Sequence, residues 1–116
     1  MRSIGWLATL DMLDINHAKR YYQRVIRTFK CADTRALANG ERVKRFATIA
    51  AIARRKLRQL EIAARLNDLR IPPGNQLEAL KGDRVGQHSI RVNDQFRVCF
   101  RWRDAGAEDV EIIDYH

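Results

Sequence analysis

The segment Ile71-Pro72-Pro73-Gly74-Asn75 divides the chain into two parts with different hydrophobic periods. Before it, apolar residues recur at spacings of three and four from Phe46 to Ala64, which predicts an amphipathic helix. After it, apolar and polar residues alternate, which predicts strands. Because two consecutive prolines cannot continue a helix, the helical part and the β part must meet by packing side by side.

The pattern predicts an α+β fold in which an N-terminal strand and helices pack on an antiparallel sheet of about four strands. The first strand is expected over residues 25–29, followed by a linking loop or short turn over 31–40. The helix is expected to begin near Glu41 and to run as one helix or as two with a break over 63–68. The later strands are expected over 76–80, 89–92, 95–102 and 110–116. Helices on one face would leave the other face open to a ligand.

The charge distribution indicates a polyanionic partner. The 116 residues carry a formal net charge of +8. Residues 1–75 hold 16 Lys and Arg against 6 Asp and Glu, whereas residues 76–116 hold 6 against 8. The basic surplus therefore lies in the helical part, where the run from Arg54 to Arg58 is either a solvated face or a docking surface. Nucleic acid is the first expectation for the partner, and an acidic protein is the second.

Cysteine, histidine and apolar residues exclude several other classes. Cys31 and Cys99 form no disulfide framework, and no Cys/His spacing is typical of zinc. No apolar run reaches the ~18 residues that a membrane-spanning helix needs. We therefore expect a cytoplasmic protein that uses neither a metal nor a cofactor and does not bind a membrane.

Cations gather on the polar face of the predicted sheet. A tight turn at Asn93 and Asp94 would place Arg91 beside Arg97. Two neighbouring arginines repel each other unless an anion lies between them, as in a phosphate site. An ordinary solvated sheet face is the alternative interpretation of the same pattern.

The chain ends in Asp114-Tyr115-His116, directly after the apolar run 110–113. A terminus held in a sheet is ordered, so these three side chains could be positioned for chemistry; the alternative is a frayed end. His116 is the histidine whose position suits proton transfer near neutral pH.

The sequence resembles the RelE superfamily of toxins, and within it the HigB branch with its GraT-like members. The resemblance covers residues 25–116 and is strongest at 72–84, at 86–100 and in the terminal Asp114-Tyr115-His116. It implies a RelE-like fold and a ribosome-dependent endoribonuclease that cuts mRNA in the ribosomal A site. It also implies a HigA-like antitoxin with a helix-turn-helix domain, through which alone the toxin would contact operator DNA.

The resemblance also implies roles for individual residues. It assigns catalysis to five of them: Asp114, Tyr115, His116, Lys81 and Arg97. Glu78 falls where some members have an active-site histidine, which leaves His116 as the main candidate for proton transfer. The expected mechanism is metal-free attack by the RNA 2′-hydroxyl, with cations stabilising the phosphorane.

Four further residues are expected to contact the RNA. Arg84 and Arg91 would hold flanking phosphates, and Gln95 falls where the HigB pattern has asparagine. His88 falls where an aromatic residue can sit, so packing or stacking on a base is expected equally with a part in catalysis. A non-catalytic RNA- or ribosome-binding module is the competing class, and a DNA-binding repressor ranks last because no helix-turn-helix pattern stands out.

Residues 1–24 lie outside the resemblance and read as a separate extension that is poorly ordered, a functional arm, or the product of an upstream start assignment. Residues 25–116 are expected to form the toxin domain. The mass of the native N-terminus would distinguish a start at Val25 from one at Met1, and an intact Met1 would contradict the start-site hypothesis.

Overall fold

A four-stranded antiparallel sheet with strand order β1-β2-β3-β4 forms the centre of the computed structural model, which describes residues 26–115. The expectations for residues 1–25 and for His116 fall outside the described residues. The strands are β1 (Glu78–Ala79), β2 (His88–Arg91), β3 (Phe96–Arg103) and β4 (Gly106–Asp114). Each strand pairs with its neighbour in sequence, as the period-two pattern predicts.

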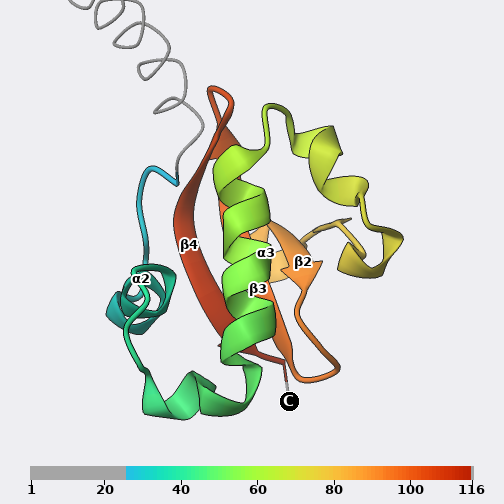
Figure 1. The fold of residues 1–116 in the computed structure, drawn as a ribbon. Helices are drawn as coiled ribbons and strands as arrows, with labels where there is room; N and C mark the ends of the chain where they lie inside the picture. The colour runs from blue at the N-terminus through green and yellow to red at the C-terminus, as the bar shows by residue number, and fades with distance from the viewer. Residues whose placement is uncertain (1–25, 116) are drawn as a thin grey trace, which may run out of the picture.

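Two α-helices, α2 (Ala32–Ala38) and α3 (Ala50–Ile62), lie against one face of this sheet (Figure 1). Within residues 26–115, four short 3₁₀ helices link the elements: η1 (Lys44–Ile49), η2 (Leu66–Arg70), η3 (Pro73–Asn75) and η4 (Gly82–Arg84). None of the helices in the described part of the chain is long and apolar enough to cross a bilayer.

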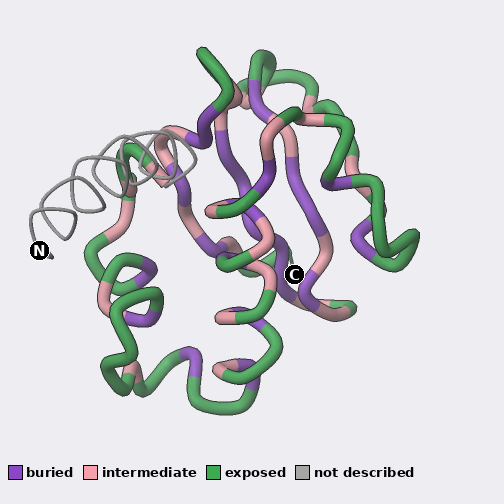
Figure 2. Tube along the Cα trace, turned by 45° about the horizontal axis from the view of Figure 1, so that its top comes forward, coloured by how far each residue is buried: buried purple, intermediate pink, exposed green. Residues whose placement is uncertain are grey.

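The hydrophobic core fills the space between the helices and the sheet. Figure 2 shows buried positions along the strands and on one side of the helical segments. The predicted helical stripe supplies Phe46, Ile49, Ala53, Leu57 and Leu60, all of them buried. The sheet supplies alternate residues of β2, β3 and β4 together with Val92, directly after β2; the strand residues are Ile90, Phe96, Val98, Phe100, Val110 and Ile112. The helices therefore cover one face of the sheet, and only the opposite face of the sheet is open to a ligand.

The helical part differs from the expectation at both ends of α3. The α-helix begins at Ala50, and the residues from Lys44 to Ile49 form the 3₁₀ helix η1 instead. At the other end the break is real, because α3 stops at Ile62 and Ala63 is extended. The Asp68 carboxylate accepts hydrogen bonds from the backbone N–H groups of Ala64 and Arg65, which satisfies the start of η2.

The expected loop over 31–40 was wrong, because residues 32–38 form α2. The element is too short for a helical period to be recognised, but its four residues of high helix propensity around buried Leu37 favour it. α2 is tied to the sheet by Thr34, whose fully buried hydroxyl accepts a hydrogen bond from the N–H of Ile112 at 3.0 Å.

The prediction of a regular first strand over residues 25–29 was also wrong for the residues that the structure describes. Within residues 26–29, only Phe29 forms a bridge, parallel to Val110 of β4. The ladder is interrupted because Asp109 adopts a left-handed backbone with φ 53° beside a register shift in β4. Its N–H is accepted by the Thr28 hydroxyl at 2.8 Å instead of by a backbone carbonyl.

Replacing Thr34 with valine keeps the side-chain shape and removes the acceptor for the N–H of Ile112. A buried, unpaired N–H costs about 1–3 kcal/mol, so the free energy of unfolding measured with urea should fall by about that amount. The matched control is Thr48→Val, at an exposed position, which should change it by less than about 0.5 kcal/mol. Equal effects from the two variants would contradict this role of Thr34.

Candidate active site

One row of cross-strand partners runs over all four strands on the sheet face opposite the helices. Glu78 of β1 pairs with Ser89, Ser89 with Cys99, and Cys99 with Glu111 of β4. Partners in a ladder point to the same face, so these four side chains share it with Arg97, two residues before Cys99. Ser89 and Cys99 are nevertheless fully buried, which means that longer side chains cover them.

Arg97 is the central cation of this face. Only 9% of the residue is exposed. Its Nε donates to the Ser89 hydroxyl at 2.8 Å and its Nη2 donates to the carbonyl of Gln76 at 2.7 Å. The carboxylate of Glu78 lies 3.6 Å from Nη2. The guanidinium is therefore held in one orientation, and hydrogen bonds to the described residues use two of its five N–H donors.

Tyr115 lies over this arginine, with the Arg97 Cζ 5.8 Å from its ring centroid. Tyr115 is 47% exposed, and partial removal of water from its hydroxyl is the main cause that raises its pKa. Nearby Cys99 and Glu78 raise this pKa further, whereas Arg97 and a hydrogen bond with Ser89 lower it. Burial likewise raises the pKa of the Cys99 thiol. At neutral pH both groups stay protonated, so Tyr115 can donate a hydrogen bond to an anion but is a poor base.

Arg84 reaches the same face from the loop before β2. Its Nη1 donates to the side-chain oxygens of Gln87 and Glu111, both at 3.1 Å. Gly82, at the start of η4, has a φ of 63°, a left-handed conformation that an L side chain rarely adopts. This turn lets the loop fold back so that Arg84 meets Glu111 across the sheet.

The end of β4 is fastened by Gln95. The backbone N–H of Tyr115 donates to the Gln95 carbonyl at 2.7 Å, and the Gln95 amide donates to the Asp114 carboxylate at 2.9 Å. Both Asp114 and Tyr115 are therefore attached to the residue directly before β3, up to the last described residue. His116 lies outside the described residues.

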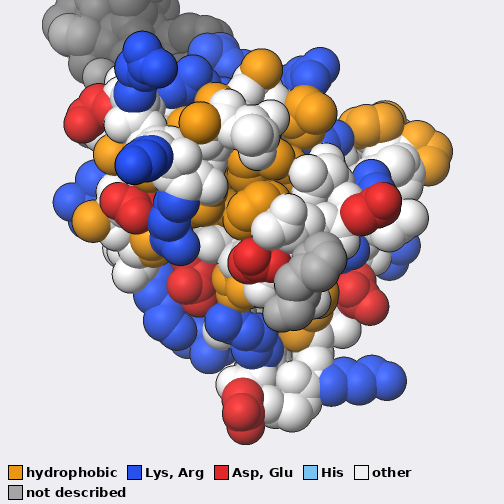
Figure 3. All heavy atoms as spheres, turned by 90° about the horizontal axis from the view of Figure 1, so that it is seen from below, with side chains coloured by type: hydrophobic (Ala, Val, Ile, Leu, Met, Phe, Trp, Pro, Cys, Tyr) orange, Lys and Arg blue, Asp and Glu red, His pale blue; other side chains and the backbone are white. Residues whose placement is uncertain are grey.

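The structure brings only some of the predicted site residues together. Arg97, Tyr115 and Arg84 share the open face, and Gln95 and Asp114 lie at the adjoining strand ends. Lys81 is exposed in the loop before η4. Figure 3, a view of the end of the molecule that carries the C-terminus, shows Lys and Arg interspersed with Asp and Glu.

Arg91 pairs directly with Arg97 in the ladder, as the predicted turn requires. Its guanidinium forms an ion pair with Asp94, however, and it borders a hollow beside Lys56 of α3. β1 ends its pairing at Ser89, so Arg91 lies on a free edge around which a long side chain can bend. The two arginines are thus neighbours along the backbone with different partners.

His88 lies on the helix side of the sheet, away from Arg97. Its ring stacks on Phe100 with centroids 6.2 Å apart, and its Nδ1 is buried without a hydrogen-bond partner. Burial, and then the charge of Arg70, lower the pKa of His88 below its ordinary value. Of the roles that the sequence leaves open for His88, packing is the one that this placement favours.

Three groups of the site were not identified from the sequence. Ser89 anchors Arg97, the backbone carbonyl of Gln76 does the same, and Glu111 binds Arg84. The alternation of β2 and β3 could have identified Ser89, since it places Ser89 and Arg97 on one face. Among residues 26–115, no three His, Cys, Asp or Glu side chains lie close enough together to bind a metal ion.

The fold and this face define a small basic α+β protein with an oriented arginine on its open sheet. The family model for the RelE-like toxin of the type II toxin–antitoxin system HigB matches residues 19–116. The chain therefore belongs to the HigB-like family of RelE-like toxins, and its helices on a four-stranded antiparallel sheet confirm the expected fold class.

Two curated proteins are similar over part of their length. Toxin HigB-1 of Vibrio cholerae serotype O1 is 53% identical over 53 residues, which cover 46% of this chain and 56% of that protein. An uncharacterized protein of Haemophilus influenzae is 40% identical over 50 residues, covering 43% and 50%. The chain thus spans about half the length of the curated relatives that it matches.

A His88→Phe variant tests whether His88 is buried in its neutral form. Because the folded state lowers the pKa of His88, its contribution to stability is present above the ordinary pKa and is lost as the pH falls below it. The free energy of unfolding of the unaltered chain, measured with urea, should fall from about pH 7 to about pH 5. The free energy of unfolding of the variant should fall less over the same range. Identical pH dependence in the two proteins would contradict the burial of a neutral His88.

Proposed function

We propose that this chain is the toxin of a toxin–antitoxin pair and acts in the cytoplasm as a ribosome-dependent endoribonuclease that cleaves mRNA in the ribosomal A site. The observation that carries the proposal is Arg97, a buried guanidinium fixed by Ser89 and Gln76 on the open face beside Tyr115. An oriented cation of this kind suits an RNA phosphate. The HigB-like family and the toxin name of the Vibrio relative agree with it.

In the proposed reaction, the 2′-oxygen attacks the phosphorus and the bond to the 5′-oxygen breaks. The proton of the 2′-hydroxyl passes to a base, and an acid protonates the departing 5′-oxygen. Arg97 and Lys81 stabilise the phosphorane, and the protonated Tyr115 donates a hydrogen bond or stacks on a base. Proton transfer is assigned to His116, oriented by Asp114. The products are a 2′,3′-cyclic phosphate and a 5′-hydroxyl.

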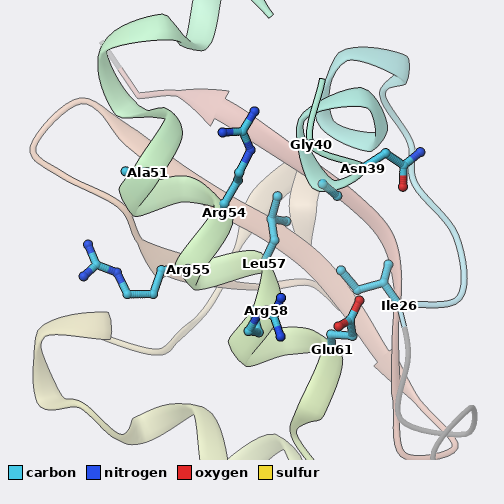
Figure 4. Close-up of a pocket in the computed structure, with 10 residues that line it drawn as sticks. Ile26, Asn39, Gly40, Ala51, Arg54, Arg55, Leu57, Arg58 and Glu61 are labelled. Atoms are coloured by element: carbon cyan, nitrogen blue, oxygen red, sulfur yellow. The ribbon is translucent and has the colours of Figure 1, made fainter. Parts of the chain in front are cut away.

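The helical part would contact ribosomal RNA in this proposal. A hollow of about 650 Å³ lies between α2 and α3, with arginines extending from α3 along it (Figure 4). Arg54 donates to the carbonyls of Leu37 and Glu41, so it also holds the end of α2. Arg58 forms no ion pair with any described residue and is available to a phosphate backbone.

The proposed partners are the ribosome with its mRNA and a HigA-like helix-turn-helix antitoxin, with operator DNA contacted only through that antitoxin. The competing function is a non-catalytic RNA- or ribosome-binding module. The basic surface favours binding in both cases, and only cleavage separates them. No cofactor is assigned.

Cleavage of mRNA on purified translating ribosomes tests the proposal. Arg97→Gln should lower the cleavage rate by about 10²–10³-fold, because it removes the charge that stabilises the phosphorane, and His116→Ala should abolish cleavage. The matched control, Arg103→Gln at the far end of β3, should cleave normally. Thermal unfolding verifies that each variant is folded. If Arg97→Gln does not fold, Arg97→Lys replaces it as a variant that keeps the charge. Intact mRNA with the unaltered chain would leave the binding module as the function.

A further inference from the structure

A groove lies between α3 and the segment that contains η2 and η3. Figure 1 shows this segment beside α3. Two hollows form it, of about 230 Å³ and about 320 Å³, and Gln59 of α3 lines both. The α3 wall carries Ile52 and Ile62, and the opposite wall carries Ile71 and Pro72. This surface lies on the helical side of the molecule, apart from Arg97 and Tyr115.

The groove is built into the fold. The fully buried side chain of Asn75 accepts a hydrogen bond from the Lys56 Nζ at 2.6 Å and donates to the Gln59 side chain at 2.8 Å. The same amide donates to the carbonyl of Leu69 at 3.0 Å. Because one buried amide joins both walls, the groove keeps its width without a ligand.

The walls are unusually apolar for an exposed surface. Five large hydrophobic residues are exposed in residues 26–115, and three of them, Ile52, Ile62 and Ile71, line this groove. Ile71 is 75% exposed. Exposed aliphatic side chains grouped in this way are typical of a protein-binding groove, whereas nucleic-acid interfaces are polar and strongly basic.

Cations occupy one end of the groove. Arg55, Lys56 and Arg91 all border the larger hollow. Burial, and then the like charges of Arg55 and Arg91, lower the pKa of Lys56, so this end favours an incoming anion. A second copy of the chain would bring the same cations into a two-fold interface, which disfavours self-association here.

We propose that this groove binds the antitoxin, through an amphipathic segment whose aliphatic side chains contact Ile62 and Ile71 and whose acidic residues face Arg55, Lys56 and Arg91. The inference rests on the antitoxin partner of the proposed function and is independent of the cleavage chemistry. Aliphatic anchors along one face of a helix suit a groove of this shape. Binding at this surface leaves the open sheet face uncovered by that segment.

Calorimetric titration of the purified chain with its purified cognate antitoxin tests the surface. Ile71→Asp should raise the dissociation constant by at least about tenfold, since it places a charge in an apolar contact. The matched control is Val85→Asp, at a residue 70% exposed outside the groove, and it should leave the constant unchanged. Arg55→Glu should weaken binding as well, with Arg35→Glu on α2 as its control. Ile62→Asp provides a second apolar variant should Ile71→Asp not fold.

Unchanged affinity of the folded groove variants would overturn the inference. So would a changed oligomeric state or a lost ribosome affinity in Ile71→Asp while antitoxin binding persists, because the groove would then belong to another partner. Growth inhibition in the absence of antitoxin should survive Ile71→Asp, and rescue by the antitoxin should not. If the unaltered chain does not bind the antitoxin at all, the partner in the proposed function fails, and this surface assignment fails with it.

Discussion

Arg97 must remain charged while it is almost excluded from water, and the open face of the sheet is arranged around that requirement. A buried cation is costly unless hydrogen bonds and an opposite charge compensate it. Ser89 and the Gln76 carbonyl provide the hydrogen bonds, and Glu78 provides the carboxylate. The compensation is incomplete, because Glu78 is mostly exposed and hydrogen bonds to described residues use two of the five donors. A phosphate can therefore replace the carboxylate at an arginine that is already oriented.

The two faces of the sheet have different roles, since one packs against the helices and the other carries the candidate site. The helices seal one face with the core, which draws His88 into packing against Phe100. The other face carries Arg97, Arg84 and Tyr115, and the backbone bond from Tyr115 to Gln95 holds the end of β4 beside them. The helical side presents a basic hollow beside α2 and an apolar groove beside η3. We therefore assign mRNA, ribosomal RNA and the antitoxin to three surfaces of one small domain, of which the last two adjoin at Arg55.

The sequence predicted the parts of the fold that a hydrophobic period can specify. The stripe from Phe46 to Leu60 and the alternation after Asn75 predicted the helix and the sheet, although the α-helix begins at Ala50 and not near Glu41. The Asn93-Asp94 turn predicted the pairing of Arg91 with Arg97. α2 and the bridge at Phe29 were not predictable, because seven residues are too few for a period and a bulge at Asp109 is a tertiary feature. For the site, alternation gave the face of Arg97 but not its contacts with Ser89 and Gln76, which depend on side-chain conformation. The alternation also could not show that the Arg91 side chain bends around a free strand edge toward Lys56.

The chemical nature of the RNA ends produced on translating ribosomes tests the central claim most directly. Attack by the 2′-hydroxyl at a phosphate held by Arg97 requires a 2′,3′-cyclic phosphate on the upstream fragment and a 5′-hydroxyl on the downstream fragment. Mass spectrometry of the fragments, together with their labelling by polynucleotide kinase without prior dephosphorylation, reads both ends. We expect these two ends with the unaltered chain. Fragments with a 5′-phosphate and a 3′-hydroxyl would contradict it, because water and not the 2′-oxygen would then be the nucleophile.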